Sequence, residues 1–277
     1  MKRVIIADSC LELNDELKKR MDVKLIPVNL DLGDEYIKDE EGLDIEEFVR
    51  KMKAYQGVPK TAAPSPNAFY EAMQGYDEVF IVSITSKLST IYNSAMIAKQ
   101  MMNESNPGVK VHVFDSKSAV SGETLLAIEI NEMIEKQSPF EVIVENIENR
   151  IKEMRTYFVL ENLDNLVKNG RMSKLAGKVA AALSINPVCR AVDGQIEVVN
   201  KTRGMKAGLA KMVSQITDGI EDLSKRTLVI GHVLNPERAQ DLKARFEELH
   251  KFKDIQVVPA KGVTSIYANE GGIVVAL

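Results

Sequence analysis

The sequence contains no tryptophan, only two cysteines and only three histidines in 277 residues. Cys10 and Cys189 lie far apart, with neither CxxC spacing nor a histidine cluster beside them. This pattern argues against a disulfide-based scaffold and gives no sign of a metal centre. We therefore expect two reduced structural thiols, no metal and no cofactor.

Long apolar runs are also absent. No stretch approaches the roughly 18 residues that a membrane-spanning helix needs. The first ten residues, MKRVIIADSC, pass from charge directly into a strand pattern, not into the apolar core and cleavage site of a signal peptide. These features predict a cytoplasmic protein without stable membrane insertion.

An excess of positive charge is missing as well. The chain has 36 Lys and Arg against 40 Asp and Glu, for a net charge of -4. Because nucleic-acid binding needs a concentrated basic face, no nucleic-acid partner is predicted. The charge is uneven, however: residues 168–206 hold eight basic and two acidic residues, a net +6, which leaves -10 for the rest. Either a solvated surface or a bound anion or acidic partner explains this bias.

Apolar runs of strand length alternate with longer segments of helical period, which is typical of an α/β protein. At this length one core tends to divide into two. The pattern changes after about residue 157, where residues 188–192 and 195–199 flank Asp193-Gly194 as in an antiparallel hairpin. We expect two domains: residues 1–157, a three-layer α/β/α domain with a mostly parallel sheet, and residues 158–277, an α/β domain with a mixed sheet.

The expected elements follow from these runs. In the first domain, strands are predicted at residues 4–7, 23–30, 79–82 and 109–114, a solvated acidic loop at 31–44, and helices near 13–21, 45–55, 91–102, 124–134 and 141–154. In the second, strands are predicted at 157–160, 228–230, 255–258 and 273–276, and helices at 163–168, at 176–183 and from Asn235-Pro236 onward.

Three predicted strands of the first domain end in small polar residues just before a helix. They are followed by Asp8-Ser9, by the run Ser83–Thr90 that contains Ser86 and Ser89, and by Asp115-Ser116 with Ser118 and Ser121. The carboxyl ends of parallel strands meet at one edge of a sheet, where ligands bind and helix N-termini favour anions. Each instance alone is also explained by helix capping.

A fourth polar stretch runs from Lys60 to Pro66, on a predicted loop before a helix. Ser65 can cap that helix, with Pro66 at its first position. Capping does not explain Thr61, whose hydroxyl is left available.

Common catalytic motifs are missing: there is no GxSxG elbow and no HExxH. His232, beside Gly231 at a strand end, is the histidine placed most like a site residue, although a structural role explains it too. One alternative function is therefore an enzyme acting on a small anionic metabolite or phosphate ester. It would use Asp8, Asp115 and His232 at the sheet edge, with Arg171 as an anion clamp.

The order of these motifs resembles that of the DegV family of bacterial proteins. The matching residues, in chain order, are Asp8-Ser9, Thr61 to Pro66, Ser86 to Ser89 running into Tyr92 to Ala95, Asp115-Ser116, Gly170 to Ser173, Asn186-Pro187 and Lys201 to Arg203. The resemblance spans nearly the whole chain.

The resemblance implies a non-enzymatic, two-domain lipid-transport protein. Such a protein holds one long-chain fatty acid, for example hexadecanoate, in an apolar tunnel between the domains, and some members present its carboxylate to a fatty acid kinase. Thr61 and Ser89 match the residues that receive the carboxylate. Arg171 matches an arginine associated with the phosphate chemistry and the kinase partner. Further residues near the head group would be Asp8, Ser9, Ser86, Asp115, Ser116 and Asn269.

Two departures from the family pattern concern the carboxylate site. Ala62-Ala63 replaces Ser-Gln after Thr61, and Thr90-Ile91 replaces Gly-Thr after Ser89. A third concerns the head group: Ala268 to Gly272 stands in place of a His-Thr-Gly-Pro-Gly motif, so Asn269 can hydrogen bond but carries no charge. Glu270 would repel an acyl phosphate if it faced the ligand. The resemblance therefore supports fatty-acid binding more strongly than it supports presentation of the fatty acid to a kinase.

Overall fold

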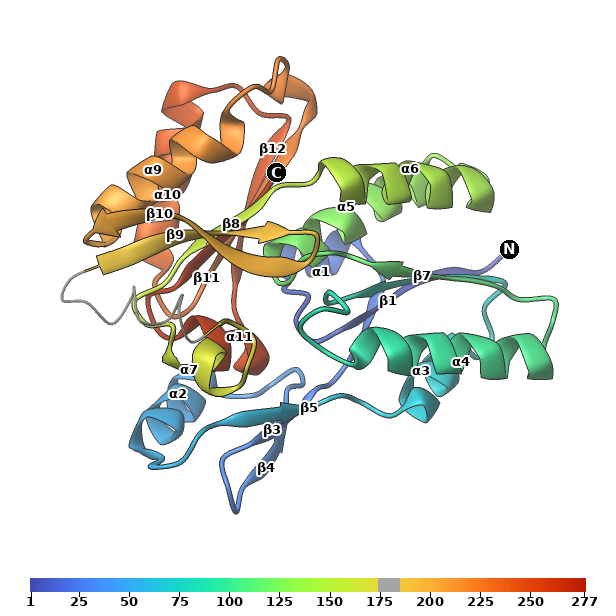
Figure 1. The fold of residues 1–277 in the computed structure, drawn as a ribbon. Coiled ribbons are helices and arrows are strands. Elements are labelled where there is room, and N and C mark those ends of the chain that lie inside the picture. The colour runs from blue at the N-terminus through green and yellow to red at the C-terminus, as the bar shows by residue number, and fades with distance from the viewer. Residues whose placement is uncertain (174–184) are drawn as a thin grey trace.

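The computed structural model describes residues 1–173 and 185–277. Its first large sheet has the order β2-β1-β6-β7, and neighbouring strands run parallel (Figure 1). The strands are β1 (Arg3–Asp8), β2 (Val23–Ile26), β6 (Glu78–Ser83) and β7 (Lys110–Asp115). The helix predicted at 176–183 lies outside the described residues.

The second large sheet has the order β10-β9-β8-β13-β11-β12. Its strands are β8 (Thr156–Val159), β9 (Ile185–Val192), β10 (Gln195–Arg203), β11 (Thr227–His232), β12 (Asp254–Pro259) and β13 (Ile273–Ala276). β11 and β12 are parallel, and the other neighbouring pairs are antiparallel. The predicted α/β class, with a parallel first sheet and a mixed second sheet, is confirmed. The division at residue 157 stays a prediction.

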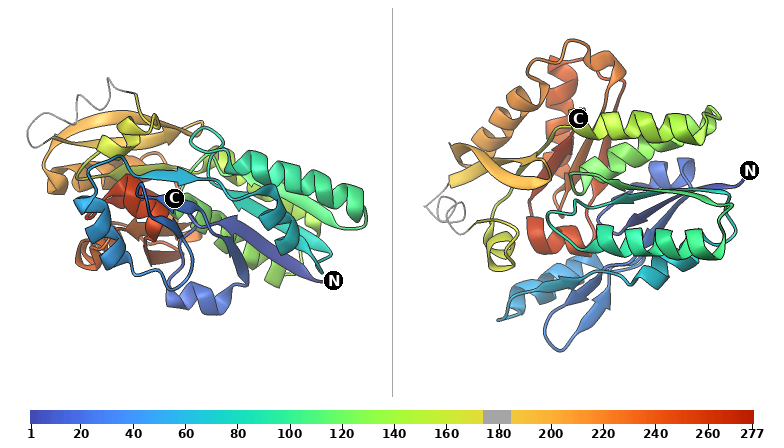
Figure 2. Two further views of the ribbon diagram at one scale, coloured as in Figure 1. Left: turned by 90° about the horizontal axis from the view of Figure 1, so that it is seen from below. Right: turned by 45° about the vertical axis from the view of Figure 1, so that its right-hand side comes forward.

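Helices cover both large sheets, and two further views show these layers (Figure 2). The helices are α1 (Asp15–Arg20), α2 (Ile45–Ala54), α3 (Pro66–Met73), α4 (Ile91–Ser105), α5 (Ser121–Glu135), α6 (Phe140–Glu153), α7 (Asp164–Lys168), α9 (Met205–Thr217), α10 (Pro236–Leu249) and α11 (Gly262–Ala268), with a short 3-10 turn at Leu223–Lys225. Within the described ranges, none of them is both long and apolar enough to cross a bilayer.

Side chains alternate along β1 between two cores. Val4 and Ile6 pack with α3 and α4 on one face, whereas Ile5 and Ala7 pack with α5 and α6 on the other. This alternation follows from the two-residue period of a strand and produces the predicted α/β/α layering. On the second sheet, α9 and α10 cover one face.

Helix α5 is shared by the two large sheets. Its apolar residues join one core with Phe80 and Val82 of β6 and with Val229 of β11. The start of α5 lies close to β11, since a Cβ on Gly231 would lie 2.9 Å from side-chain atoms of both Val120 and Ser121. The Ser121 hydroxyl also donates to the Val274 carbonyl at 2.8 Å. Burial of α5 on both sides therefore fixes the first sheet against the second.

Several elements differ from the prediction near the N-terminus. The strand expected at 23–30 splits at Pro27 into β2 and β3 (Asn29–Asp31), because proline has no N–H for the ladder. The stretch expected as a solvated acidic loop contains β4 (Tyr36–Lys38), and the loop holding Thr61 contains β5 (Lys60–Ala62). Together they form a small antiparallel sheet of order β4-β3-β5.

Two helices of the C-terminal half, α9 and α11, were not anticipated. Helix α11 has only seven residues and no side-chain cap of its own. Its N-terminus is instead held by Asp39, which is only 1% exposed and accepts from the backbone N–H groups of Gly262 at 2.7 Å and Val263 at 3.1 Å. A carboxylate from the small sheet therefore positions a helix more than 200 residues away.

Other predicted signals are confirmed. Asp193 and Gly194 both adopt positive φ, 46° and 80°, between β9 and β10. The side chain of Asn235 accepts from the Arg238 N–H at 3.1 Å, with proline at the first position of α10. Cys10 and Cys189 are both buried and free. Burial raises the pKa of Cys189 to about 12.

Asp39→Ala should destabilise the fold by about 2–4 kcal/mol, because it leaves two buried backbone N–H groups and the Ser9 hydroxyl without their acceptor. Urea unfolding measures the loss. Glu41→Ala is the matched control, since Glu41 is exposed and pairs with exposed Lys18, and it should change stability by less than about 0.5 kcal/mol. Equal effects of the two variants would contradict the proposed role of Asp39.

His232→Asn should flatten part of the pH dependence of stability. Burial lowers the pKa of His232, whose Nδ1 accepts from the Asn235 N–H at 3.3 Å. The unfolded chain therefore takes up a proton near pH 6.5 that the folded chain resists, so this histidine weakens the fold as the pH falls below that value. Unfolding free energies at pH 7 and pH 5 should show the advantage of wild type over His232→Asn shrinking. If the difference in unfolding free energy between the two proteins is the same at both pH values, His232 does not contribute to the pH dependence.

Candidate functional site

A cavity of about 380 Å³ lies between the carboxyl ends of the first sheet and the inner face of the second. This volume is within the range of roughly 300–1,000 Å³ typical of small-molecule sites. Loops after β1, β6 and β7 supply one wall, including Cys10, Ile84 and Val120. Strands β8 and β13 supply the opposite wall. The site therefore forms only when both large sheets are in place.

Most of the cavity wall is apolar. The apolar side chains are Val28, Ala63, Ile84, Leu88, Ile91, Ala119, Val120, Phe158, Leu160, Leu166, Ala191, Ile196, Val263, Ala268 and Val274. Such a surface gains free energy by burying a hydrocarbon, at about 0.8 kcal/mol for each methylene. The geometry therefore suits a ligand that is largely apolar.

Polar groups gather at one part of the wall. The hydroxyls of Thr61 and Tyr267 share a hydrogen bond of 2.9 Å, and the Arg171 guanidinium lies 5.7 Å from the centre of the Tyr267 ring. Arg171 also donates from Nε to the Leu88 carbonyl at 3.2 Å, beside Ser89. All of these residues line the cavity. We call Thr61, Ser89, Arg171 and Tyr267 the polar end.

Arg171 gives the polar end a positive charge. Its Nη1 donates to the Asn169 carbonyl at 2.6 Å, and within the described ranges no carboxylate pairs with it. A guanidinium held only by carbonyl oxygens and an aromatic ring retains its preference for an anion. The polar end therefore favours a negatively charged head group.

Ser89 lies two residues before the first residue of α4, Ile91. Its Oγ accepts from the Ile91 N–H at 3.3 Å, which leaves the hydroxyl proton free to be donated into the cavity. Helix α4 runs for 15 residues, so the positive end of its dipole adds to the field there.

Other predicted site residues hold the loops around the cavity. Asp8 is fully buried, and its two oxygens accept from the backbone N–H groups of Cys10 at 3.0 Å and Ile84 at 2.9 Å. Burial raises the pKa of Asp8. Ser9 donates to Asp39 at 2.9 Å and accepts from the Val28 N–H at 3.1 Å. Neither Asp8 nor Ser9 lines the cavity.

The loop after β7 is arranged in a similar way. Asp115 accepts from the Ser86 N–H at 3.1 Å and the Ser86 hydroxyl at 2.5 Å. Burial favours a higher pKa for Asp115, but the bonds from Ser86 and the nearby Lys117 charge outweigh it, so the pKa lies below its ordinary value. Ser116 bonds to Ser118. Of these residues, Ser86 and Ser118 line the cavity.

The C-terminal residues singled out from the sequence lie outside the cavity wall. Asn269 donates to the Asn162 carbonyl at 3.2 Å, and Glu270 forms a surface ion pair with Lys53. His232 is buried at the end of β11. Asp8, Asp115 and His232 therefore do not converge on one open cleft, as the alternative enzyme would require.

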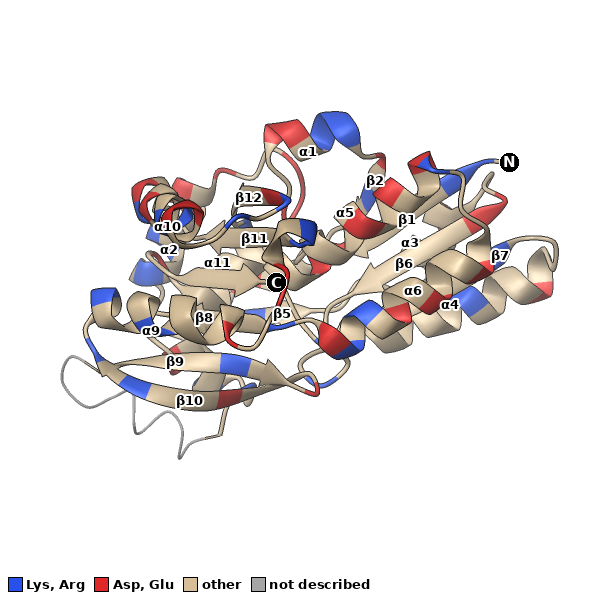
Figure 3. Ribbon diagram, turned by 90° about the horizontal axis from the view of Figure 1, so that it is seen from above, with Lys and Arg blue, Asp and Glu red and all other residues tan. Residues whose placement is uncertain are grey.

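The basic segment 168–206 is spread over several elements. Figure 3 shows Lys and Arg positions spaced along β9 and β10, where Arg190, Lys201 and Arg203 lie. Lys174 and Lys178 fall outside the described residues. Arg171 is the basic residue of this segment, as far as it is described, that lines the cavity.

Tyr267 was missed by sequence reasoning. It belongs to the short helix α11, which has no local start signal, and its partners Thr61 and Arg171 are distant in the chain. The nearest available signal was the stretch Ala268 to Gly272, which starts at the next residue.

Comparison with known proteins gives a consistent result. The profile of the family described as "uncharacterised protein, DegV family" matches residues 2–277. A DegV domain-containing protein of Streptococcus pyogenes serotype M1 is 34% identical over 272 residues, 97% of this chain and 96% of that protein.

Solved structures are similar over the full length. A DegV family protein from Ruminococcus gnavus, refined with vaccenic acid, has a TM-score of 0.94 and 34% identity, covering 99% of each chain. The fatty acid kinase (Fak) B3 protein of Streptococcus pneumoniae, loaded with linoleic acid, has a TM-score of 0.91 and 33% identity, covering 100% of this chain and 99% of its own. Family profile, relatives and structures agree: the chain belongs to the DegV family.

Proposed function

We propose that the chain binds one long-chain fatty acid in the cavity, with its carboxylate at the polar end. The observation that carries the proposal is a largely apolar cavity with hydroxyls at one part of its wall, beside a guanidinium that pairs with no carboxylate of the described residues. The relatives solved with vaccenic and linoleic acid, and a DegV family protein from Eubacterium eligens loaded with heptadecanoic acid, support it at 32–34% identity.

The tail supplies most of the affinity in this proposal. Burying about fourteen methylenes at roughly 0.8 kcal/mol each gives a gross gain on the order of 11 kcal/mol, before ordering costs. A hydrogen bond to a charged group adds about 1.5–3 kcal/mol. The polar end therefore fixes which end of the ligand enters and where the carboxylate rests.

Each residue of the polar end has a distinct role. Thr61 and Ser89 donate their hydroxyl protons to the carboxylate, and Tyr267 holds Thr61 in place or donates itself. Arg171 anchors the loop before α4 through the Leu88 carbonyl and supplies positive charge. Asp8, Ser9, Asp115 and Ser116 act indirectly, since they fix the surrounding loops, and Ser86 both bonds to Asp115 and lines the cavity.

The chain acts as a carrier without catalytic turnover, in the cytoplasm, and presents the carboxylate to a fatty acid kinase. Likeness to the Fak B3 protein supports the kinase as partner. The departure at Asn269 and Glu270 does not oppose it, because Glu270 pairs with Lys53 away from the cavity. Residues 1–157 and 158–277 form the two domains, with the ligand between them.

Native mass spectrometry of the purified chain tests the proposal. One bound acyl chain should appear, and organic extraction should release a free fatty acid. A protein that carries no lipid and takes up no labelled fatty acid would overturn the proposed function.

Thr61→Val combined with Ser89→Ala should weaken fatty-acid binding without unfolding the chain. Losing one or two hydrogen bonds to a carboxylate lowers affinity by roughly ten- to a hundredfold each, while the tail still binds. Displacement of a fluorescent fatty acid measures this. Unchanged binding and exchange would show that the hydroxyls were wrongly assigned.

Tyr267→Phe should weaken binding by a smaller factor, because it removes the hydroxyl that holds Thr61 but keeps the ring beneath Arg171. Tyr70→Phe is the matched control: it removes an exposed hydroxyl that donates to Ser105 outside the cavity, and it should leave binding unchanged. If both variants bind like wild type, Tyr267 has no part in the polar end.

Arg171→Gln should impair phosphorylation more than binding. An acyl phosphate carries more negative charge than a carboxylate, so it loses more when the guanidinium is removed. With the kinase of Streptococcus pneumoniae, we expect the phosphorylation rate to fall at least about tenfold and fatty-acid affinity to fall less. Arg203→Gln, on exposed β10, is the control. Equal losses in both assays would contradict this role, and inactivity of the wild type would contradict the kinase partner.

A further inference from the structure

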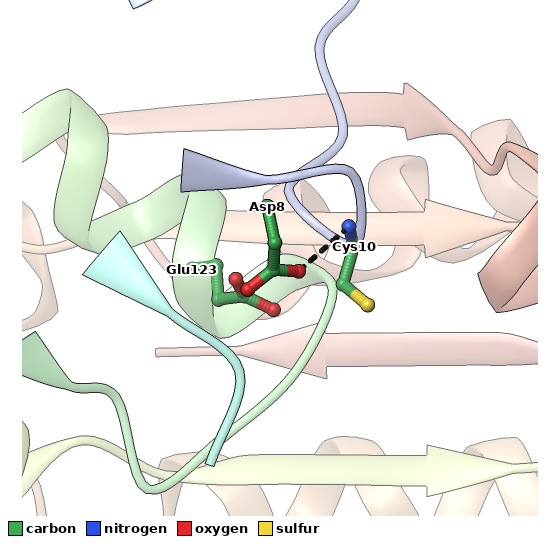
Figure 4. A group of neighbouring side chains, drawn as sticks. All are labelled: Asp8, Cys10 and Glu123. Carbon is green, nitrogen blue, oxygen red and sulfur yellow. Dashed lines mark hydrogen bonds between the residues drawn. The ribbon is translucent and has the colours of Figure 1, made fainter. Parts of the chain in front are cut away.

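Three side chains that can bind a metal meet beside the cavity. Asp8 ends β1, Cys10 lies in the turn that follows, and Glu123 lies in the first turn of α5. One possible ligand atom from each lies within 4.8 Å of the other two. Figure 4 shows the two carboxylates side by side, with the Cys10 backbone nitrogen bonded to Asp8 and the Cys10 sulfur on the outer side of the group. Sequence patterns do not reveal this cluster, because Glu123 is more than 100 residues from the other two.

Glu123 is the unusual member of the cluster. Its side chain is 0% exposed, and among the described residues neither carboxylate oxygen has a partner at full hydrogen-bond geometry, although the nearby Val120 N–H acts to lower its pKa. A buried polar group without a partner is strongly unfavourable, and buried charges are normally paired or bound to a metal. The Glu123 oxygens lie beside Asp8, so a proton or a cation held between the two carboxylates would satisfy them.

Two further acidic residues are buried close to this cluster. Glu12 and Asp39 are also buried nearby, and one oxygen of Glu12 has no hydrogen-bond partner. Burial raises the pKa of each of these acids, and Lys261 is the cation that acts against the rise in all four. One lysine would offset only part of the negative charge that these four acids carry when they are ionised.

We propose that Asp8, Cys10 and Glu123 bind a zinc ion. A thiolate with two carboxylates suits zinc better than magnesium or calcium, which prefer oxygen ligands alone. Ligand atoms of a tetrahedral zinc site lie roughly 3.3–3.6 Å apart, so the three side chains must close by about 1 Å. Moving the Glu123 carboxylate breaks no side-chain hydrogen bond or ion pair among the described residues.

Zinc binding would displace the protons of two of the ligands. Cys10 and Glu123 release theirs to solvent, and the sulfur and the oxygens donate lone pairs to the metal. Cys10 lines the cavity, so a water molecule from that side can take the fourth position. The ion would tie the loop after β1 to the start of α5, beside the lipid cavity.

Metal binding to the full chain, stripped with EDTA and then dialysed, tests the site. Titration with zinc chloride should show one equivalent bound and a higher Tm. Cobalt substitution should give the charge-transfer absorption of a cobalt thiolate. Glu123→Gln should lower zinc affinity at least roughly tenfold, and Cys10→Ser should abolish the cobalt band. Cys189→Ser, the other buried thiol, should keep both signals.

Two outcomes would overturn the site. One is a wild-type chain that binds no zinc at excess metal, in which case a proton shared by Asp8 and Glu123 explains the cluster. The other is binding without a thiolate band, or with a band that survives Cys10→Ser. If Cys10→Ser fails to fold, the wild-type cobalt spectrum still decides. Fatty-acid uptake is measured separately, so failure here does not affect the proposed function.

Discussion

Burial of α5 between the two large sheets is the constraint on which the rest of the structure depends. The helix contributes to one apolar core with β6 and β11, and Gly231 allows its first turn to approach the second sheet. The Ser121 bond to the Val274 carbonyl fixes the helix along its axis. Because both sheets pack on the same helix, a gap is held between the carboxyl edge of the first sheet and the inner face of the second. That gap is the cavity.

The polar end depends on four segments that are distant in the chain. Thr61 comes from a small sheet, Ser89 from the loop before α4, Arg171 from the turn after α7 and Tyr267 from α11. Side-chain amides hold these segments together: Asn165 donates to the Ile266 carbonyl at 2.8 Å and Asn169 to the Pro59 carbonyl at 3.1 Å. A head group at this position would contact all four segments at once.

The sequence was informative wherever the signal is local. The Asp193-Gly194 turn and the Asn235-Pro236 helix start needed only neighbouring residues, and each matches the structure. Thr61 was singled out because capping did not explain it, and it lies on the cavity wall. Helix α11 could not be foreseen, since its cap is Asp39 from another sheet. The burial of Asp8 with Glu123 could not be foreseen either. Whether an acidic residue is buried depends on tertiary packing, and the same residue type occurs on protein surfaces.

The shared helix also determines what would happen if the chain were divided into two fragments. A fragment that ends near residue 157 would keep α5 but lose β11 and β13, and so would expose Leu125 and Ile128 of the shared core. The complementary fragment would present the bare inner face of its sheet. Because this core would be divided, we expect the two pieces to fold together and re-associate when supplied separately, with α5 as the contact that joins them.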